Sequence, residues 1–197
     1  MGGAHGYAIA ADAPGCAVVA GYAFPVGFPV LNPIAPGGVA VPGVGTWPNG
    51  FVAKLNPSGS ALIYSSLIGG SLGRDYVLGM DMDAQGDVLL VGYTESADFL
   101  PLKNPVQPTF GGGSADAFAL KLDSSGSVIY STYLGRSGAE AQGSTIGALD
   151  SAGRAWITTV TRGTDLPLVD EVQSASGGDF DCWRLRLSQE GAAIEFL

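Results

Sequence analysis

The chain has 197 residues, of which 31 are Gly, 12 are Pro, 14% are charged and 46% are hydrophobic. Soluble domains usually hold about 25% charged residues and about 12% Gly and Pro together. This balance excludes a long-helix protein and a disordered chain, and it favours many short strands joined by tight turns.

The charge balance limits the partners that the chain would bind. Nine Lys and Arg stand against 18 Asp and Glu, which gives a net charge of −9, and the densest basic spot is Arg184 with Arg186. Binding to a polyanion needs positive charge that releases counterions. We therefore expect no binding to nucleic acid or to anionic membrane surfaces. No apolar run reaches the 18 residues of a membrane span, and the first residues lack the basic-then-apolar order of a secretory signal.

Six turn motifs follow one another along the chain. An Asp-x-x-Gly tetrad alternates with a second tetrad that also ends in Gly, at residues 12–15, 56–59, 83–86, 123–126, 150–153 and 188–191. Both suit a type I turn followed by Gly in the left-handed conformation, which closes a β-hairpin. The first tetrad recurs at steps of 71 and 67 residues and the second at steps of 67 and 65. One unit is therefore present three times.

Each unit consists of two predicted hairpins with a long Pro-rich connection between them. Apolar residues beside the turns alternate with a period of two, which is typical of strands. A four-stranded meander of about 60 residues is the unit of a β-propeller, and it stacks on its neighbours to bury its faces. We predict an all-β fold of three four-stranded antiparallel blades, at about residues 5–70, 74–138 and 142–197, with almost no helix. The side chains expected to pack between neighbouring blades are Phe51, Leu55, Phe118, Leu120, Leu122, Trp183, Leu185 and Leu187.

Three segments resemble a known repeat. They read Phe-Val-Ala-Lys-Leu-Asn-Pro-Ser-Gly-Ser-Ala-Leu-Ile-Tyr-Ser at residues 51–65, Asp-Ala-Gln-Gly-Asp-Val-Leu-Leu-Val-Gly-Tyr-Thr at 83–94, and Asn-Pro-Val-Gln-Pro-Thr-Phe-Gly-Gly-Gly at 104–113. On these segments nearly the whole chain resembles the bacterial β-propeller repeat called SBBP. The third unit departs from the pattern, with Thr158 and Thr159 in place of Gly-Tyr. The resemblance implies blades of a large secreted or surface protein of bacteria or archaea, and it brings no catalytic residue set and no cofactor.

The nucleophiles of the chain lack the partners that catalysis needs. Residues 69–73 match the G-x-S-x-G pattern, with Ser71 in the nucleophile position. A nucleophile elbow needs a following helix and a His partner, whereas the single His is His5 and no helix is predicted after Ser71. Cys16 and Cys182 have no motif spacing and are expected to be unpaired thiols. We predict a loop of the repeat at residues 69–73 and no catalytic residue.

The acidic residues show no catalytic or metal-binding pattern. Asp81, Asp83 and Asp87 occupy positions 1, 3 and 7 of a calcium-loop pattern, but Gly92 replaces its final Glu. We predict a hairpin turn there and no metal site, while weak calcium binding by acidic surface loops stays open. Glycoside hydrolysis needs two converging carboxyls. Spacing singles out no pair among Asp81, Asp165, Asp170, Glu171, Asp179 and Asp181.

The long connections at residues 25–49 and 96–115 are the expected binding surface, since loops on one rim of a propeller commonly carry function. The leading hypothesis is a non-enzymatic scaffold that makes adhesive or protein–protein contacts, outside the cell as the resemblance implies. The second is a glycan-binding module that uses rim aromatics such as Trp47, Phe99 and Phe110. The third is a fragment of a propeller hydrolase or lyase.

Three blades leave an open wedge, because propellers close with four or more. We expect the free faces of the first and third blades to be apolar, and apolar faces of that size drive association. The chain is therefore expected either to be part of a longer propeller or to complete a ring by self-association.

Overall fold

The computed structural model describes residues 3–34, 47–99, 102–165 and 178–196. The first sheet contains β1 (Ala4–Ala11), β2 (Ala17–Ala23), β3 (Asn49–Leu55) and β4 (Leu62–Ile68). The second contains β5 (Asp75–Met82), β6 (Val88–Thr94), β7 (Asp116–Leu122) and β8 (Val128–Leu134). The third contains β9 (Glu140–Leu149), β10 (Ala155–Thr161), β11 (Asp181–Leu187) and β12 (Ile194–Phe196). These ranges hold no helix, and so none that would cross a membrane.

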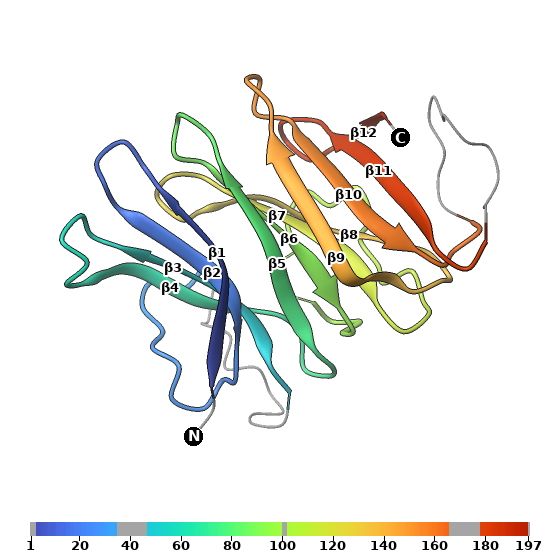
Figure 1. Ribbon diagram of the computed structural model, residues 1–197, viewed down its shortest axis with the longest axis horizontal. Helices are drawn as coiled ribbons and strands as arrows, with labels where there is room; N and C mark the ends of the chain where they lie inside the picture. Colours follow the sequence, from blue (N-terminus) through green and yellow to red (C-terminus); the bar gives the residue numbers. More distant parts are fainter. Residues whose placement is uncertain (1–2, 35–46, 100–101, 166–177, 197) are drawn as a thin grey trace.

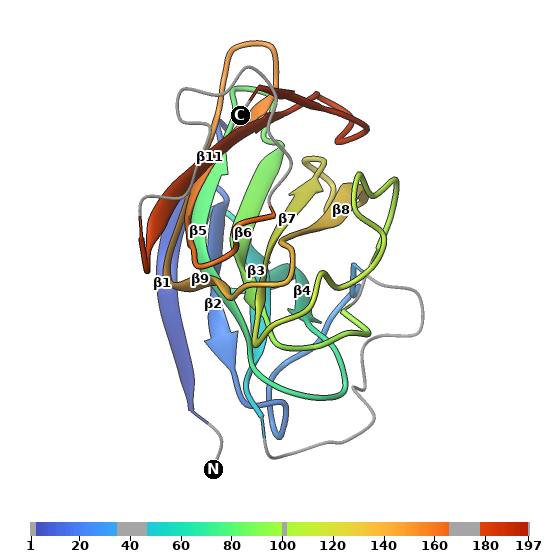
Figure 2. The same cartoon turned by 90° about the vertical axis from the view of Figure 1, so that its right-hand side faces the viewer.

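Each sheet is an antiparallel meander in which the strands lie in chain order. The sheets follow one another from left to right in Figure 1, and none is closed on itself, so they are arranged like adjacent blades of an open propeller. The first strands β1, β5 and β9 lie on one side of the molecule, with β4 and β8 on the other (Figure 2). β5 contacts both β1 and β9. The predicted fold class is confirmed.

All six predicted turns are present. In each, the Gly amide donates to the carbonyl of the residue three positions earlier, over 2.8–3.0 Å, and the Gly φ lies between 68° and 91°. We call the edge that carries these turns the turn rim. The long connections leave from the opposite edge, where β1 and β3 begin and β2 and β4 end, which we call the loop rim.

The second sheet is buried on both faces. Phe118, Leu120 and Leu122 of β7 share one core with Val18 and Val52 of the first sheet. The alternate residues of the second sheet face the third, and this second core gathers Leu89, Val91, Ala117, Ala119, Trp183, Leu185 and Leu187. The period-two pattern of β7 therefore separates two buried faces rather than a buried face from an exposed one.

Two predicted core residues lie elsewhere. Phe51 is 6% exposed but belongs to a small cluster with Ala23 and Leu67, and Leu55 is only half-buried. Because Val52 faces the second sheet, the alternation of β3 turns Phe51 and Leu55 to the opposite face. No sheet packs against that face in the described part of the chain. The expectation that these two side chains pack between blades of this chain is therefore wrong.

The long connections fold back along the outer strands. The amide and carbonyl of Leu31 bond to the backbone of Ser65 in β4, at 3.0 and 2.7 Å. At the corresponding place of the second sheet, the Ser131 amide donates to the Lys103 carbonyl over 2.8 Å. These bonds cover part of an outer sheet edge that would otherwise be open to another strand.

Candidate functional site

A row of aromatic side chains crosses the joint between the first and second sheets, beside the loop rim. The rings of His5 and Tyr76 both stack on Tyr22, at centroid distances of 4.7 and 4.3 Å. Tyr93 meets Tyr76 edge-on at 5.1 Å, and Tyr7 lies 5.7 Å from Tyr22. His5 and Tyr7 are exposed and the other three are half-buried. We call these five residues the aromatic row.

Strand pairing places the row. His5 and Tyr76 are the second residues of β1 and β5, and they pair with Tyr22 and Tyr93 in the next strands. Burial raises the pKa of both Tyr76 and Tyr93, so these phenols stay protonated at neutral pH. Among the described residues, the hydroxyls of the tyrosines in the row have no hydrogen-bond partner.

A further exposed aromatic side chain lies at the loop rim with an arginine over it. Trp47 is 44% exposed, and the guanidinium carbon of Arg74 lies 5.4 Å from its ring centroid. Arg74 Nη1 is 3.9 Å from a carboxylate oxygen of Glu95. The third sheet repeats the arrangement, with Arg162 placed 4.1 Å from the ring centroid of Phe180. Such pairs are stabilised by the cation–π attraction while both partners still face solvent.

The other two aromatic residues proposed for the rim lie in or against the core. Phe99 is fully buried, with its ring 4.6 Å from Phe118, and its amide donates to the Tyr133 hydroxyl over 2.8 Å. Phe110 is half-buried against Tyr133, at a centroid distance of 6.0 Å. The interpretation of Phe99 as a rim aromatic is therefore wrong, and of the three only Trp47 is exposed.

Ser71 is bonded to an acid rather than to a histidine. Its hydroxyl and amide donate to the Asp98 carboxylate over 2.5 and 2.9 Å, whereas His5 belongs to the aromatic row. The Ser137 amide repeats this contact with Asp165 at 3.3 Å in the next unit. The G-x-S-x-G match is thus a loop contact of the repeat, as the sequence predicts.

The two cysteines lie in different sheets. Cys16 is buried beside the first turn, and Cys182 is exposed in β11. Both are free, and the Cys182 sulfur lies 3.1 Å from the Thr158 hydroxyl. The prediction of unpaired thiols is confirmed.

The acids of the calcium-like pattern contact three different partners. Asp81 accepts from the Leu149 amide over 2.7 Å, and Asp83 accepts from the amides of its own turn. Asp87 lies 3.7 Å from the Lys121 ammonium. In the described ranges, no three His, Cys, Asp or Glu side chains gather as a metal site would need. Of the other acids considered, Asp179 and Asp181 lie at the start of β11, and Asp170 and Glu171 lie outside the described residues.

Sequence reasoning missed the buried carboxyls at the loop rim. Asp75 begins β5 and is fully buried, where it accepts from the Gly70 amide over 3.0 Å and from the hydroxyls of Thr94 and Ser96. Burial raises the pKa of Asp75 to about 7, although these hydrogen bonds oppose the shift. The carboxyl thus belongs to a closed network that fixes the start of the second sheet.

A pair of acidic residues lies at the joint between the second and third sheets. Burial raises the pKa of Asp116 to about 7, and the charge of Glu140 adds to the shift. The two carboxyls flank Gly135, where a Cβ would lie 2.5 Å from Asp116 Oδ1 and 2.6 Å from Glu140 Oε2. Oδ1 of Asp116 is buried without a partner among the described residues. Asn49 holds the register position of Asp116 in the first sheet.

A groove of about 560 Å³ lies between the first two long connections and a turn of the second sheet. Its walls are Asn32, Pro33, Ile34, Leu102, Lys103 and residues 125–128. Lys103 donates to the Val128 carbonyl, and no acid is among these lining residues. The groove therefore lacks an acid–base pair.

A comparison with known protein families finds no match. A search of curated proteins finds no match either.

Proposed function

We propose that this chain is a non-enzymatic, propeller-type scaffold whose loop rim binds a partner through adhesive or protein–protein contacts. The observation that carries the proposal is the gathering of exposed aromatic and cationic side chains at that rim and on the adjoining part of β1. Tyr7 is 54% exposed, Trp47 is 44% exposed, and Arg74 lies over the Trp47 ring. Tyr, Trp and Arg are the residue types most enriched at the energetic centres of protein interfaces.

The sheets supply a rigid support for this surface. Four members of the aromatic row, His5, Tyr22, Tyr76 and Tyr93, lie one residue inside the strand ends of β1, β2, β5 and β6, and all four strands are paired on at least one side. Tyr7 lies two residues further along β1. Stacking of His5 and Tyr76 on Tyr22 links the two sheets and leaves few rotamers open. A preorganised aromatic surface loses little conformational entropy when a partner binds.

The resemblance to the SBBP repeat adds a location to the proposal. It supports a bacterial protein that acts outside the cell or on its surface. The acidic balance of the chain, with a net charge of −9, favours partners that are neutral or basic.

Glycan binding is the second candidate, and the aromatic row favours it. The phenol hydroxyls of Tyr7 and Tyr76, which have no hydrogen-bond partner within the described ranges, offer donors and acceptors of the kind that sugar hydroxyls need, and so does the Arg74 and Glu95 pair. The exposed ring of Trp47 offers an apolar face. Phe99 takes no part in such a site because it is buried.

The test exposes the full chain to an array of glycans and to an array of purified extracellular proteins. Trp47→Ala and Tyr7→Ala remove rim aromatics, and Ile63→Ala is the control, since it removes a 38% exposed apolar side chain from β4 instead. The scaffold is supported if the chain binds proteins but no glycans, if both rim variants weaken this binding, and if the control variant leaves it unchanged. Binding to glycans with the same pattern supports the second candidate. Turnover of a bound glycan, or binding that neither rim variant changes, contradicts the proposal.

A further inference from the structure

The first sheet leaves uncovered a face that the other two sheets bury. The turn tetrads fix the correspondence, because Ile9, Met80 and Gly147 each lie three residues before the Asp of the first turn of their unit. Met80 is partly buried in the core between the first and second sheets. A Cβ on Gly147 would lie 2.9 Å from both Leu89 and Val91 of the second sheet. Ile9, by contrast, is 73% exposed.

The turn glycines show the same difference. A Cβ on Gly126 would lie 2.8 Å from the Tyr64 ring of the preceding sheet, and Gly191 packs in the same way on Tyr130. Both glycines are buried, whereas Gly59 is exposed with no atom within 4 Å of its Cβ position. All three have nearly the same local conformation, with φ of 68° to 91°. The turn at Gly59 therefore has the backbone conformation that accepts a tyrosine ring in the other two sheets. No described residue packs on it.

The aromatic pairs repeat the pattern. Phe28 lies 5.1 Å from Phe51 in the first unit, as Phe99 lies 4.6 Å from Phe118 in the second. Phe99 and Phe118 are fully buried, but Phe28 is half-buried and Phe51 keeps 6% exposure. The same packing is therefore present in both units, and only the covering sheet differs.

Each joint within the chain also uses one buried lysine. The Lys54 ammonium donates over 2.9 Å to the Ser124 carbonyl, in a turn of the second sheet. The Lys121 ammonium donates over 2.8 Å to the Gly153 carbonyl, in a turn of the third. A sheet that covers the next one thus presents a Lys from its third strand and a Tyr from its fourth.

The outer face of the third sheet is built differently. Larger or charged side chains occupy the register positions of small ones: Ile146 stands where Gly79 stands, and Arg184 where Ala119 stands. A Cβ on Gly79 would already lie 3.1 Å from the Thr145 carbonyl of the following sheet. Ile146 is 61% exposed and Arg184 is exposed, so the expectation of a wholly apolar face on the third blade is not met.

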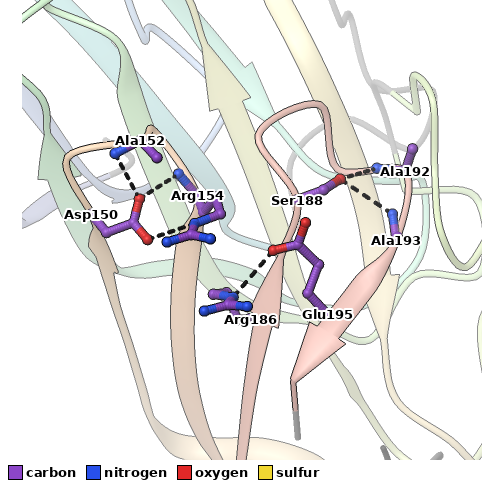
Figure 3. Close-up of polar contacts among 8 residues, drawn as sticks. All are labelled: Asp150, Ala152, Arg154, Arg186, Ser188, Ala192, Ala193 and Glu195. Atoms are coloured by element: carbon purple, nitrogen blue, oxygen red, sulfur yellow. Dashed lines mark hydrogen bonds and ion pairs between the residues drawn. The ribbon is translucent and has the colours of Figure 1, made fainter.

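The residue at the lysine position of the third sheet has partners within its own sheet. Arg186 donates from Nε to Glu195 over 3.1 Å, as Figure 3 shows, and its guanidinium carbon lies 5.0 Å from the Trp156 ring centroid. The third sheet therefore lacks the lysine by which the first two sheets contact the turns of their neighbours.

We propose that the free face of the first sheet, defined by Ile9, Val19, Phe28, Phe51 and Gly59, docks a further blade of this repeat type. That blade presents a lysine from its third strand, which reaches a turn carbonyl of the first sheet, and a tyrosine from its fourth, which packs on Gly59. The occupant is not the third sheet of a second copy. The charged Arg184 stands where the two covering sheets carry the apolar Val52 and Ala119, and Ile146 stands where they carry the smaller Ala8 and Gly79. The proposal does not depend on what the loop rim binds.

The test supplies such a blade and measures whether Ile9 becomes covered. A second copy of residues 74–138 is placed directly before Gly3 of the full chain. Residues 135–138 and Gly3 then separate the two strands by five residues, the same number as residues 135–139 between β8 and β9. Ile9→Cys is introduced together with Cys182→Ser, since Cys182 is exposed and Cys16 is buried. We expect labelling by a thiol reagent to slow at least about tenfold relative to the chain without the added blade, because a docked side chain reacts only on opening.

Two controls show whether any protection is specific to the free face and depends on the added lysine and tyrosine. Ile146→Cys, on the outer face of the third sheet, is expected to react at the same rate with and without the added blade. Lys121→Ala together with Tyr130→Ala, made in the added copy alone, is expected to restore fast labelling at residue 9. Unchanged labelling of Ile9→Cys, or protection of Ile146→Cys instead, overturns the proposal. Labelling that slows with protein concentration in the chain without the added blade shows that a second copy occupies the face, which also overturns it.

Discussion

The ammonium group of Lys121 donates a hydrogen bond of 2.8 Å to the carbonyl of Gly153, and so fixes a side chain of the second sheet to a turn of the third. Lys121 is fully buried, and Asp87 lies 3.7 Å from the same nitrogen and balances its charge. A buried ammonium group is costly unless it is hydrogen-bonded and paired. The contact therefore specifies how far apart the two sheets lie as well as adding to their packing.

Lys121→Met tests this contact, since methionine keeps the apolar stem and removes the charge. The Gly153 carbonyl and the Asp87 carboxylate then lose their partner, and we expect the free energy of unfolding to fall by about 2–3 kcal/mol. Arg154→Met is the control, because Arg154 pairs with Asp150 on a partly exposed turn, where an ion pair contributes less than about 1 kcal/mol. Denaturant titration measures both, and equal losses would show that the buried lysine has no special role.

The turn glycines allow a matched comparison between a covered and an uncovered turn. Gly126→Ala and Gly59→Ala carry a similar cost of about 1 kcal/mol for a positive φ. At Gly126 the added methyl also meets the Tyr64 ring at 2.8 Å, whereas at Gly59 it meets nothing within 4 Å. We expect Gly126→Ala to lose about 1–3 kcal/mol more than Gly59→Ala. Equal losses of stability for the two variants, in a thermal or denaturant melt, would contradict the packing of Gly126 on Tyr64 between the first and second sheets.

Truncating two corresponding phenylalanines compares a side chain buried between two sheets with one on the free face of the first sheet. Phe118 is fully buried between two sheets, and Phe118→Ala is expected to cost about 3–5 kcal/mol. Phe51 lies on the free face beside Phe28, so Phe51→Ala leaves a cavity open to solvent, and we expect it to cost about half as much. A loss below about 1 kcal/mol for Phe118→Ala in a denaturant titration would contradict the strand register.

Asp116 gives the protein a pH dependence with a definite sign. Its pKa in the folded protein is raised to about 7 from the ordinary 3.8, chiefly by burial. The folded state therefore holds a proton that the unfolded state releases, and stability is lost as the pH rises through about 4 to 7. We expect Asp116→Asn, which copies Asn49 in the first sheet, to make this part of the stability curve less steep and to be more stable than the parent at pH 8 by about 1–3 kcal/mol. The slope that is left comes from Asp75, whose pKa is also raised to about 7. Chemical denaturation from pH 4 to pH 8 measures both curves.

A partly buried turn acid is the control for that experiment. The pKa of Asp123 is lowered, because its hydrogen bonds from Ser125 and Ser127 outweigh the cost of burial. Asp123→Asn is expected to leave the slope between pH 5 and pH 8 unchanged, since that carboxyl is ionised throughout. The same slope in the parent and in Asp116→Asn would refute the assignment of the pH dependence to Asp116.

The amino-acid sequence by itself determined the strands and the turns of this protein. The hydrogen bond from Gly126 to Asp123 and the positive φ of Gly126 involve only four consecutive residues. The local sequence therefore predicts this turn at any place in the chain. The repeat of these tetrads then gave the number of strands and their order, because short hairpins leave few ways to connect them.

Only the tertiary structure decided which side of each sheet is covered and which side chains remain exposed. Phe51 and Phe118 have the same local sequence, yet one faces a neighbouring sheet and the other does not. Phe99 reads as a loop aromatic and is buried, while His5, Tyr22 and Tyr76 come from three strands and meet only when two sheets join. The raised pKa of Asp116 likewise depends on burial and on Glu140 across a joint. These properties depend on distances between residues remote in the chain, and neither turn chemistry nor strand periodicity contains those distances.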